Sequence, residues 1–362
     1  MHVGKKNPGY KCENSYIDSW KCDQSNIITE EYYEGVFKVR QAFQTKYLGE
    51  VISSDGTNTA NVSNRKRRGF GTVKDIVNML DNMCLGPYMF QKAAVLRDSM
   101  LVGTLLSCSE VWYNVNEVEL GQLEQVDKGL WCQILEVART VPYDLICLEL
   151  GIEPLRYIIM RRRLMYLQHV LKQKDTSLVK QFLKTQLISP KKKDWITTVK
   201  ENLKHLNIKH TLENIQEMPT ETYKKLIKNK IKEEAFNYLI LKRNKRNGKG
   251  MDIEYTHLEM QNYLSSEDID ITNEDRKLIF QLRTKMHFKI KTHFRNMHEN
   301  TLCSGCRIQE STTQHTLECK SILGRNEILS YIPNYLDLFG IDEDEQVYLA
   351  RIIRENLKRL PA

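Results

Sequence analysis

The chain has 362 residues, and its 54 Lys and Arg against 46 Asp and Glu give a formal net charge of 54 − 46 = +8. With 41% hydrophobic and 28% charged residues, the composition excludes wholesale disorder and allows a packed core. Its 17 Gly and 8 Pro exclude collagen-like and Pro-rich chains, which predicts a mainly α protein of two ordinary domains or one large domain.

The sequence contains no run of about 18 apolar residues, so it predicts no membrane-spanning helix. Residues 1–12 lack the apolar core of a secretory signal. We therefore expect an intracellular protein, in the nucleus or the cytoplasm. Its nine cysteines should be reduced there, so close Cys spacing favours a metal site or core packing over a disulfide.

The N-terminal residues 1–70 contain short β-prone runs separated by polar residues. The clearest candidate strand covers residues 47–52. The Asp55-Gly56 pair that follows favours a turn, because both residues tolerate positive φ. We expect a small β element in this part of the chain.

After Gly71 the hydrophobic residues recur at the i, i+3, i+4, i+7 spacing of amphipathic helices, and Gly86-Pro87 interrupts the first of them. We expect helices over residues 73–80, 89–100, 101–112, 118–137, 155–171, 195–206, 223–241 and 274–297, with a basic loop or linker over 244–250.

The strongest motif is Cys303-x2-Cys306-x8-His315-x3-Cys319. Three thiolates and one imidazole are the four soft donors of a tetrahedral structural Zn²⁺ site, and the i, i+4 spacing of His315 and Cys319 places both on one helix face. Because the protein fills all four positions, we expect a structural rather than catalytic ion. The alternative is three ordinary buried cysteines beside an unrelated histidine.

The remaining six cysteines have no ligand spacing, and we expect them to be packed in the core or exposed by chance. They are Cys12, Cys22, Cys84, Cys108, Cys132 and Cys147.

Residues 276–298 carry seven Lys or Arg, three His and no Asp or Glu. On one long helix, these residues would form a basic stripe beside two Phe rings, an arrangement that neutralises phosphates and stacks bases. The candidate nucleic-acid contacts are Arg276, Lys277, Phe280, Arg283, Lys285, His287, Lys289, Lys291, Phe294 and Arg295. The alternative is a solvated amphipathic helix whose Phe side chains belong to the core.

Three shorter basic clusters could also contact a polyanion, with binding that falls steeply as salt rises. They are Arg65-Lys66-Arg67-Arg68, Arg161-Arg162-Arg163 and Lys191-Lys192-Lys193. Each cluster is equally compatible with a hydrated surface, and the first is also compatible with a localisation signal.

The motifs of common enzyme classes are missing from the sequence. It contains no Walker loop, GxGxxG, HExxH or GxSxG motif and no Asp-Asp pair. We therefore expect no catalytic residue in this chain.

The segment from Lys46 to Gly56, together with 61–65 and Gly69, resembles the end of the palm in non-LTR (LINE-type) retrotransposon reverse transcriptases. The Cys-Cys-His-Cys knuckle resembles the one that many of these polyproteins carry downstream of the polymerase. The helical body between them, including 109–113 and 123–130, is similar to their thumb and post-thumb region, so the resemblance covers nearly the whole chain.

The resemblance implies a palm-end β element at 1–70, a thumb-like domain at 71–172, a basic linker region at 173–300, a CCHC knuckle at 301–325 and a helical tail at 326–362. In that family, palm aspartates hold two Mg²⁺ ions for RNA-directed DNA polymerisation. This chain lacks the tandem Asp pair. The resemblance therefore implies that only a full-length polymerase would bind Mg²⁺ and that this chain alone would be inactive.

The resemblance therefore predicts the nucleic-acid-binding C-terminal portion of such a polyprotein. RNA, DNA and the upstream catalytic palm and fingers are the expected partners, with no membrane and no small-molecule substrate. One rival is a helical protein-interaction module or domesticated transposon remnant with a structural zinc site. Another is an enzyme that acts in trans with a separately encoded palm.

Overall fold

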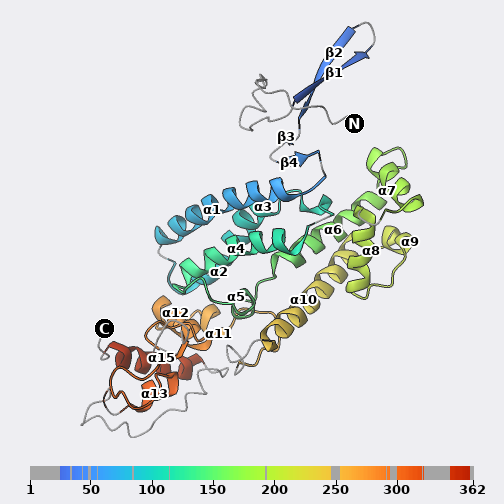
Figure 1. The fold of residues 1–362 in the computed structure, drawn as a ribbon. Helices are drawn as coiled ribbons and strands as arrows, with labels where there is room; N and C mark the ends of the chain where they lie inside the picture. The colour runs from blue at the N-terminus through green and yellow to red at the C-terminus, as the bar shows by residue number, and fades with distance from the viewer. Residues whose placement is uncertain are drawn as a thin grey trace. The chain divides into compact units, whose positions relative to one another are not determined.

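The computed structural model describes residues 25–32, 35–42, 44–47, 50–54, 56–83, 85–113, 115–191, 194–245, 253–290, 292–293, 300–319, 321 and 343–358. These residues are mainly helical, with two small sheets near the N-terminus, so the expected mainly α fold is confirmed (Figure 1). The chain divides into two compact units. Unit 1 comprises Met1–Phe70, Thr104–Leu123 and Arg162–Met218, and unit 2 comprises Gly71–Gly103, Glu124–Arg161 and Pro219–Ala362. The five-part division expected from the sequence stays a prediction.

Two antiparallel hairpins belong to unit 1. Their strands are β1 (Ser25–Tyr32) with β2 (Gly35–Ala42), and β3 (Gln44–Tyr47) with β4 (Glu50–Ser53). Because Tyr47 pairs with Glu50, the prediction of one strand over 47–52 is wrong: Tyr47 belongs to β3, whereas residues 50–52 belong to the antiparallel strand β4. The turn after β4 forms as expected. The Gly56 N–H donates to the Ser53 carbonyl at 3.1 Å, and Gly56 has a φ of +70°.

The helices largely follow the hydrophobic period of the sequence, and α6 has the predicted bounds. The described α-helices are α1 (Thr59–Asp81), α2 (Met89–Leu96), α3 (Val102–Leu105), α4 (Glu117–Ile134), α5 (Tyr143–Leu150), α6 (Leu155–Leu171), α7 (Leu178–Ile188), α8 (Trp195–His205), α9 (Leu212–Glu217), α10 (Thr220–Asn244), α11 (Asn262–Ser265), α12 (Asn273–Arg283), α13 (Thr313–Glu318) and α15 (Glu343–Lys358). Short helical turns at Gly86–Tyr88, Arg97–Leu101 and Ser109–Val111 join some of them.

Two predicted helices end early for the same reason. Helix α3 ends at Leu105, and Cys108 then has a φ of +55°, so the predicted helix over 101–112 is wrong. Helix α12 ends at Arg283, and Lys285 has a φ of +54°. A residue in the left-handed region terminates a helix, so the predicted long helix over 274–297 is also wrong.

The end of α12 has the hydrogen bonds of a Schellman motif. The N–H of Met286 donates to the carbonyl of Gln281 at 2.7 Å, and the N–H of Lys285 donates to that of Leu282 at 3.1 Å. Met286 is buried and supplies the apolar contact that accompanies this motif. The sequence carries no glycine at this position, so the break was not visible from turn residues.

Unit 1 encloses a buried arginine on α6. Arg163 donates to the carbonyl of Trp112 through Nε at 3.1 Å and to Oδ1 of Asn202 through Nη1 at 2.7 Å. Burial lowers the pKa of Arg163 to about 10. The side chain therefore ties α6 to α8 and to the segment after α3, and it is a structural group.

Unit 2 is organised around a buried carboxylate on α5. Glu149 is fully buried and accepts hydrogen bonds from the hydroxyls of Tyr255 at 2.5 Å and Tyr263 at 2.6 Å. Its third partner is Arg283 at the end of α12, whose Nε lies 3.1 Å from Oε1. A buried charge is tolerated only when it is paired and hydrogen-bonded, so this cluster joins α5, α12 and the segment before α11.

The glycine that ends α5 is required by a close backbone approach. Gly151 has a φ of +64°, and a Cβ at this position would lie 2.2 Å from the backbone of Glu259 and Met260. The Glu149 carbonyl accepts from the N–H of Gln261 at 2.9 Å. The segment before α11 therefore lies directly against the end of α5.

Removing one partner of the Glu149 cluster should destabilise unit 2. We expect Arg283→Met to lower the free energy of unfolding by about 3–5 kcal/mol, because it leaves a buried carboxylate without its cation. Urea unfolding followed by circular dichroism measures the change. Lys230→Ala is the control, since the exposed Lys230–Glu233 pair at 3.0 Å should contribute about 0.5 kcal/mol or less. Equal losses in the two variants would contradict the role given to Glu149.

Candidate metal centre and nucleic-acid interface

The first two cysteines of the motif lie in a tight hairpin. Leu302 and Glu310 form an antiparallel bridge, and the N–H of Cys303 donates to the Gln309 carbonyl at 2.8 Å. Between them the chain turns through Arg307, which has a φ of +58°. The two-residue spacing of the cysteines therefore becomes one compact loop that presents both sulfur atoms on the same side.

The second pair of donors is carried by helix α13. Thr312 caps this helix, and its hydroxyl oxygen accepts from the N–H of His315 at 2.9 Å. Cys319 follows the last residue of α13, one turn beyond His315. The capped helix therefore brings the imidazole and the third thiol to the hairpin, as the i, i+4 spacing predicts.

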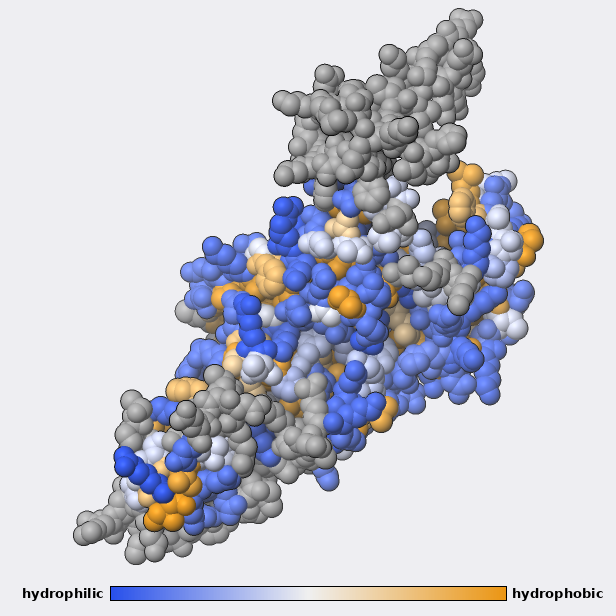
Figure 2. All heavy atoms as spheres, in the orientation of Figure 1, coloured by the Kyte–Doolittle hydropathy of each residue, from blue (hydrophilic) through white to orange (hydrophobic). Residues whose placement is uncertain are grey.

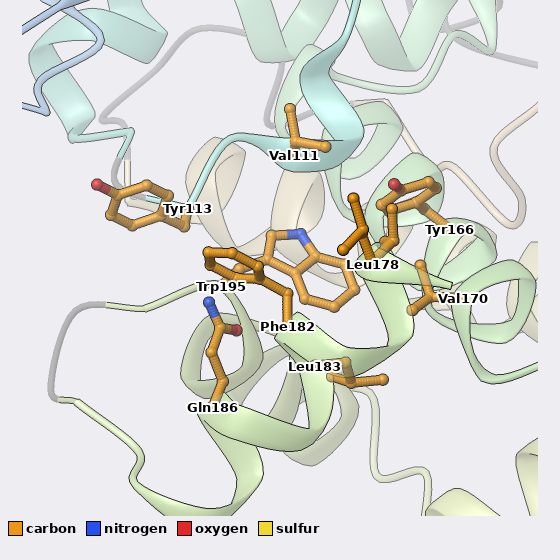
Figure 3. Close-up of a pocket in the computed structure, with 10 residues that line it drawn as sticks. Val111, Tyr113, Tyr166, Val170, Leu178, Phe182, Leu183, Gln186 and Trp195 are labelled. Atoms are coloured by element: carbon orange, nitrogen blue, oxygen red, sulfur yellow. The ribbon is translucent and has the colours of Figure 1, made fainter. Parts of the chain in front are cut away.

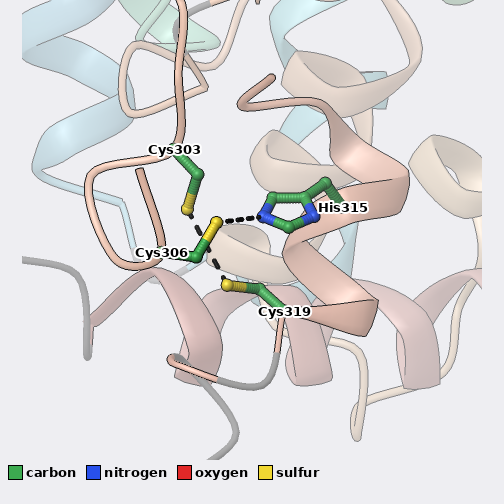
Figure 4. Close-up of side chains that lie close together, drawn as sticks. All are labelled: Cys303, Cys306, His315 and Cys319. Carbon is green, nitrogen blue, oxygen red and sulfur yellow. Dashed lines mark hydrogen bonds between the residues drawn. The ribbon is translucent and has the colours of Figure 1, made fainter. Parts of the chain in front are cut away.

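The four side chains converge (Figure 4), and their donor atoms all lie within 4.8 Å of one another. The sulfur atoms of Cys303 and Cys319 are 3.9 Å apart, and Sγ of Cys306 is 3.3 Å from Nε2 of His315. A tetrahedral ion with Zn–S near 2.3 Å and Zn–N near 2.0 Å separates its ligands by about 3.5–3.8 Å. A disulfide, by contrast, needs an S–S distance of about 2.05 Å.

Backbone amides prepare the hairpin sulfurs to carry negative charge. The N–H of Gly305 donates to Sγ of Cys303 at 3.4 Å, and the N–H of Ile308 donates to Sγ of Cys306 at 3.4 Å. The backbone amides of Gln309 and Ile308 lower the pKa of the Cys306 thiol to about 6. Thiolates are the form that binds metal, so the four-residue group could hold a metal ion.

The other described cysteines lie apart from this cluster. Cys132 and Cys147 are buried and Cys108 is exposed, and all three are free thiols. They match the expectation of packing or exposure, whereas Cys12, Cys22 and Cys84 lie outside the described residues. Among the residues that the structure describes, the Cys303 group is the set found with donor atoms close enough to share an ion.

The C-terminal helix α15 attaches the cysteine–histidine module to α12. Nδ2 of Asn356 on α15 donates to the carbonyl of Thr316 on α13 at 3.0 Å. Arg354 on α15 pairs with the buried Asp275 on α12 at 2.8 Å. On the other side, Nε2 of His293 lies 3.2 Å from the hydroxyl of Thr313. The sequence predicted a helical tail over 326–362, whereas the structure shows α15 packed against α12 and α13 in unit 2.

Within the described residues, the first part of the predicted basic stripe before the motif is buried. Arg276, Phe280 and Arg283 are each at most 1% exposed, so their assignment as nucleic-acid contacts is wrong in this fold. Arg276 donates to the carbonyl of Tyr263 at 2.7 Å, while Arg283 is held by Glu149. Tertiary contacts of α12 with Tyr263 and with Glu149 of α5 bury these side chains, and the helical period of the segment alone does not reveal such partners.

The remaining candidates of this segment have mixed positions. Lys277 is bound by Glu136 at 2.6 Å and by Glu274 at 2.9 Å. His287 is buried, whereas Lys285 and Lys289 are half-buried. Lys291, Phe294 and Arg295 lie outside the described residues.

The shorter basic clusters are also divided between interior and surface. Arg65 is buried and paired with Glu50, Lys66 is half-buried, and Arg67 and Arg68 are exposed on α1. Arg161 pairs with Glu153 at 2.7 Å. Arg162 donates to the carbonyl of Leu106, and Arg163 is buried. Lys191 is exposed, while Lys192 and Lys193 lie outside the described residues.

Unit 1 also contains an apolar pocket that the sequence did not predict (Figure 3). Its volume is about 370 Å³, and Tyr166, Phe182 and Trp195 lie among its walls. Nε1 of Trp195 donates to the Glu110 carbonyl at 2.7 Å, which fixes the indole. Hydrophobic side chains gather over α7 at the upper right of Figure 2, where Phe182 is 72% exposed.

Comparison with models of protein families, with curated proteins and with solved structures gave no match. Within the described part of the chain, no helix combines the length and the apolar character needed to cross a membrane.

Replacing a cluster ligand should abolish metal binding and loosen the module. We expect Cys303→Ser and His315→Ala to lose one equivalent of metal, and to raise amide hydrogen exchange of residues 300–319 and of α15 at least about tenfold. Elemental mass spectrometry and exchange mass spectrometry measure the two effects. Cys108→Ser, which replaces an exposed thiol outside the cluster, should change neither. Purified wild-type protein without bound metal would contradict the site.

The buried imidazole of His287 predicts a pH-dependent stability. Burial, with a smaller effect of Lys289, lowers the pKa of His287 to about 4. Since an unfolded histidine titrates near about 6.5, acidification from there to pH 4 protonates the unfolded state first and costs up to about 3 kcal/mol of stability. Above about pH 6.5 the imidazole is neutral in both the folded and the unfolded state, so this stability is fully present there. Urea unfolding from pH 7 to pH 4.5 should show a weaker pH dependence for His287→Gln than for the wild type, and parallel curves would refute this.

Proposed function

We propose that this chain is the nucleic-acid-binding C-terminal portion of a LINE-type reverse transcriptase polyprotein, and that Zn²⁺ is the ion of its cysteine–histidine cluster. The observation that carries the proposal is the convergence of Cys303, Cys306, His315 and Cys319. Three thiols and one imidazole whose donor atoms all lie within 4.8 Å of one another suit Zn²⁺ better than harder ions, which prefer oxygen ligands.

The ion would have a structural role. Cys303 and Cys319 are each 2% exposed, and protein donors fill every tetrahedral position, so no position remains for a reacting water. The cluster would therefore hold the hairpin to α13, and nucleic acid would be bound by side chains. Mg²⁺ would be needed only by a polymerase palm outside this chain. Such a protein would act in the nucleus or the cytoplasm.

The order of the sequence features supports the same proposal. The described residues of the phrase at 46–56 that resembles a palm end lie in β3, in β4 and directly after β4, and a helical body and the cysteine–histidine module follow. Within unit 1, Arg67 and Arg68 remain exposed on α1 and can contact phosphates. They are the accessible members of the first basic cluster.

A protein-interaction module, including a domesticated transposon remnant, is the second candidate. The apolar pocket of unit 1 and the exposed side chains of α7 favour it, because Leu178 and Phe182 are 78% and 72% exposed. In this case the metal would only stabilise the fold. Activity in trans with a separate palm would additionally require restored primer extension after the two chains are mixed.

Binding of a labelled single-stranded RNA or DNA to a filter, measured from low to moderate salt, tests the proposal. We expect retention at low salt that falls steeply as salt rises, because phosphate contacts release counterions. Arg67→Gln combined with Arg68→Gln should reduce the slope of log K against log salt by about 1.4, since each lost contact to a single strand contributes about 0.7.

The control carries the same charge change at Lys224 and Lys225, two exposed residues of α10. Lys224→Gln with Lys225→Gln should leave the slope nearly unchanged. Wild-type protein that retains neither RNA nor DNA at low salt would refute the proposal and favour the protein-interaction module.

A further inference from the structure

We infer that a lysine-lined hollow at the α8–α9 corner of unit 1 is a binding site for the sugar–phosphate backbone of a nucleic acid. This inference rests on the proposed function and names the surface that would perform it. The hollow has a volume of about 480 Å³ and is bordered by Lys200, Lys204 and Lys209. None of these lysines was among the contacts predicted from the sequence.

Local structure brings the three lysines together. Lys200 and Lys204 are four residues apart on α8, so they lie on one face and are separated by about 6 Å along the axis. The helix ends at His205, and Asn207 then has a φ of +52°. The N–H of Ile208 donates to the carbonyl of Leu203 at 2.9 Å, so the chain reverses and returns Lys209 toward α8.

The corner is anchored by apolar side chains beneath the lysines. Leu203, Leu206 and Ile208 are buried, and Ile215 of α9 is fully buried. The Thr211 hydroxyl oxygen accepts from the N–H of Asn214 at 3.2 Å and fixes the start of α9. The lysine stems therefore rise from a fixed backbone.

The charge of the hollow is positive. All three lysines are exposed, and within the described residues none of them forms an ion pair. No carboxylate lines the hollow. Lys200 interacts electrostatically with Asp194 at the start of α8. The Asp194 oxygens accept hydrogen bonds from the backbone N–H groups of Lys191 and Thr197.

These features favour a polyanion over other occupants. Three ammonium groups without a carboxylate repel one another, so an anion that contacts all three lowers the electrostatic energy. A strand with regularly spaced phosphates can contact lysines along α8 and at Lys209 together. Lysines act as point charges, so the contact positions a backbone and reads no sequence.

The test compares two triple variants with equal charge change in the full chain. One replaces Lys200, Lys204 and Lys209 by Gln, and the matched control replaces Lys224, Lys225 and Lys228 of α10, which are also exposed. The probe is a fluorescently labelled 30-nucleotide poly-uridine RNA, titrated from 50 to 300 mM salt. Circular dichroism and urea unfolding confirm that both variants fold.

We expect the hollow variant to reduce the slope of log K against log salt by about 2, from three contacts of about 0.7 each, while the α10 control changes it by less than about 0.5. Retention of RNA by the wild type with equal slopes in both variants overturns this inference and leaves the proposed function standing. Failure of the wild type to retain this RNA and a single-stranded DNA of the same length overturns both. Poly-glutamate that competes as strongly as an unlabelled copy of the RNA would show an acidic-protein site and would also overturn the inference.

Discussion

The packing of α5 against α12 in unit 2 depends on a buried ion pair, between Glu149 on α5 and Arg283 at the end of α12. Burying two charges is costly unless the remaining lone pairs are satisfied, and the hydroxyls of Tyr255 and Tyr263 satisfy them. Arg283 is the last residue of α12, so the pair holds the end of that helix against α5, next to the Schellman turn at Lys285.

Burial of arginines elsewhere in the chain also makes the charge of the surface differ from the charge expected from the sequence. Arg65, Arg163, Arg276 and Arg283 all belong to basic clusters, and all are buried against carboxylates or carbonyl oxygens. Arginine suits this role because it stays charged and offers several donors in a fixed plane. Basic runs therefore overstated the accessible charge, whereas the lysines of α8, which form no run in the sequence, remain at the surface.

The features that the sequence predicted correctly depend on residues close together in the chain, and those it missed depend on residues far apart. The convergence of the four cluster residues could be predicted because its geometry is local, with a two-residue spacing in one turn and an i, i+4 pair on one helix. The fate of Arg283 could not be predicted, because its partner Glu149 lies 134 residues earlier. The end of α12 was hidden too, since Lys285 adopts positive φ without a glycine or asparagine to signal it.

The metal cluster and the lysine hollow address different physical requirements. A site whose four donors come from the protein can stabilise a fold, but it has no open position for a phosphate oxygen, so its ion contributes to binding only by fixing nearby backbone. Affinity for a polyanion must then come from exposed ammonium and guanidinium groups, whose contribution depends on salt. Among the described residues, such groups include Arg67 and Arg68 on α1 and the three lysines at the α8–α9 corner of unit 1, whereas the cysteine–histidine cluster belongs to unit 2. If Zn²⁺ fills the cluster and a nucleic acid binds these cations, stability from the metal and affinity from charge would come from different residues, and each could be changed without replacing the other.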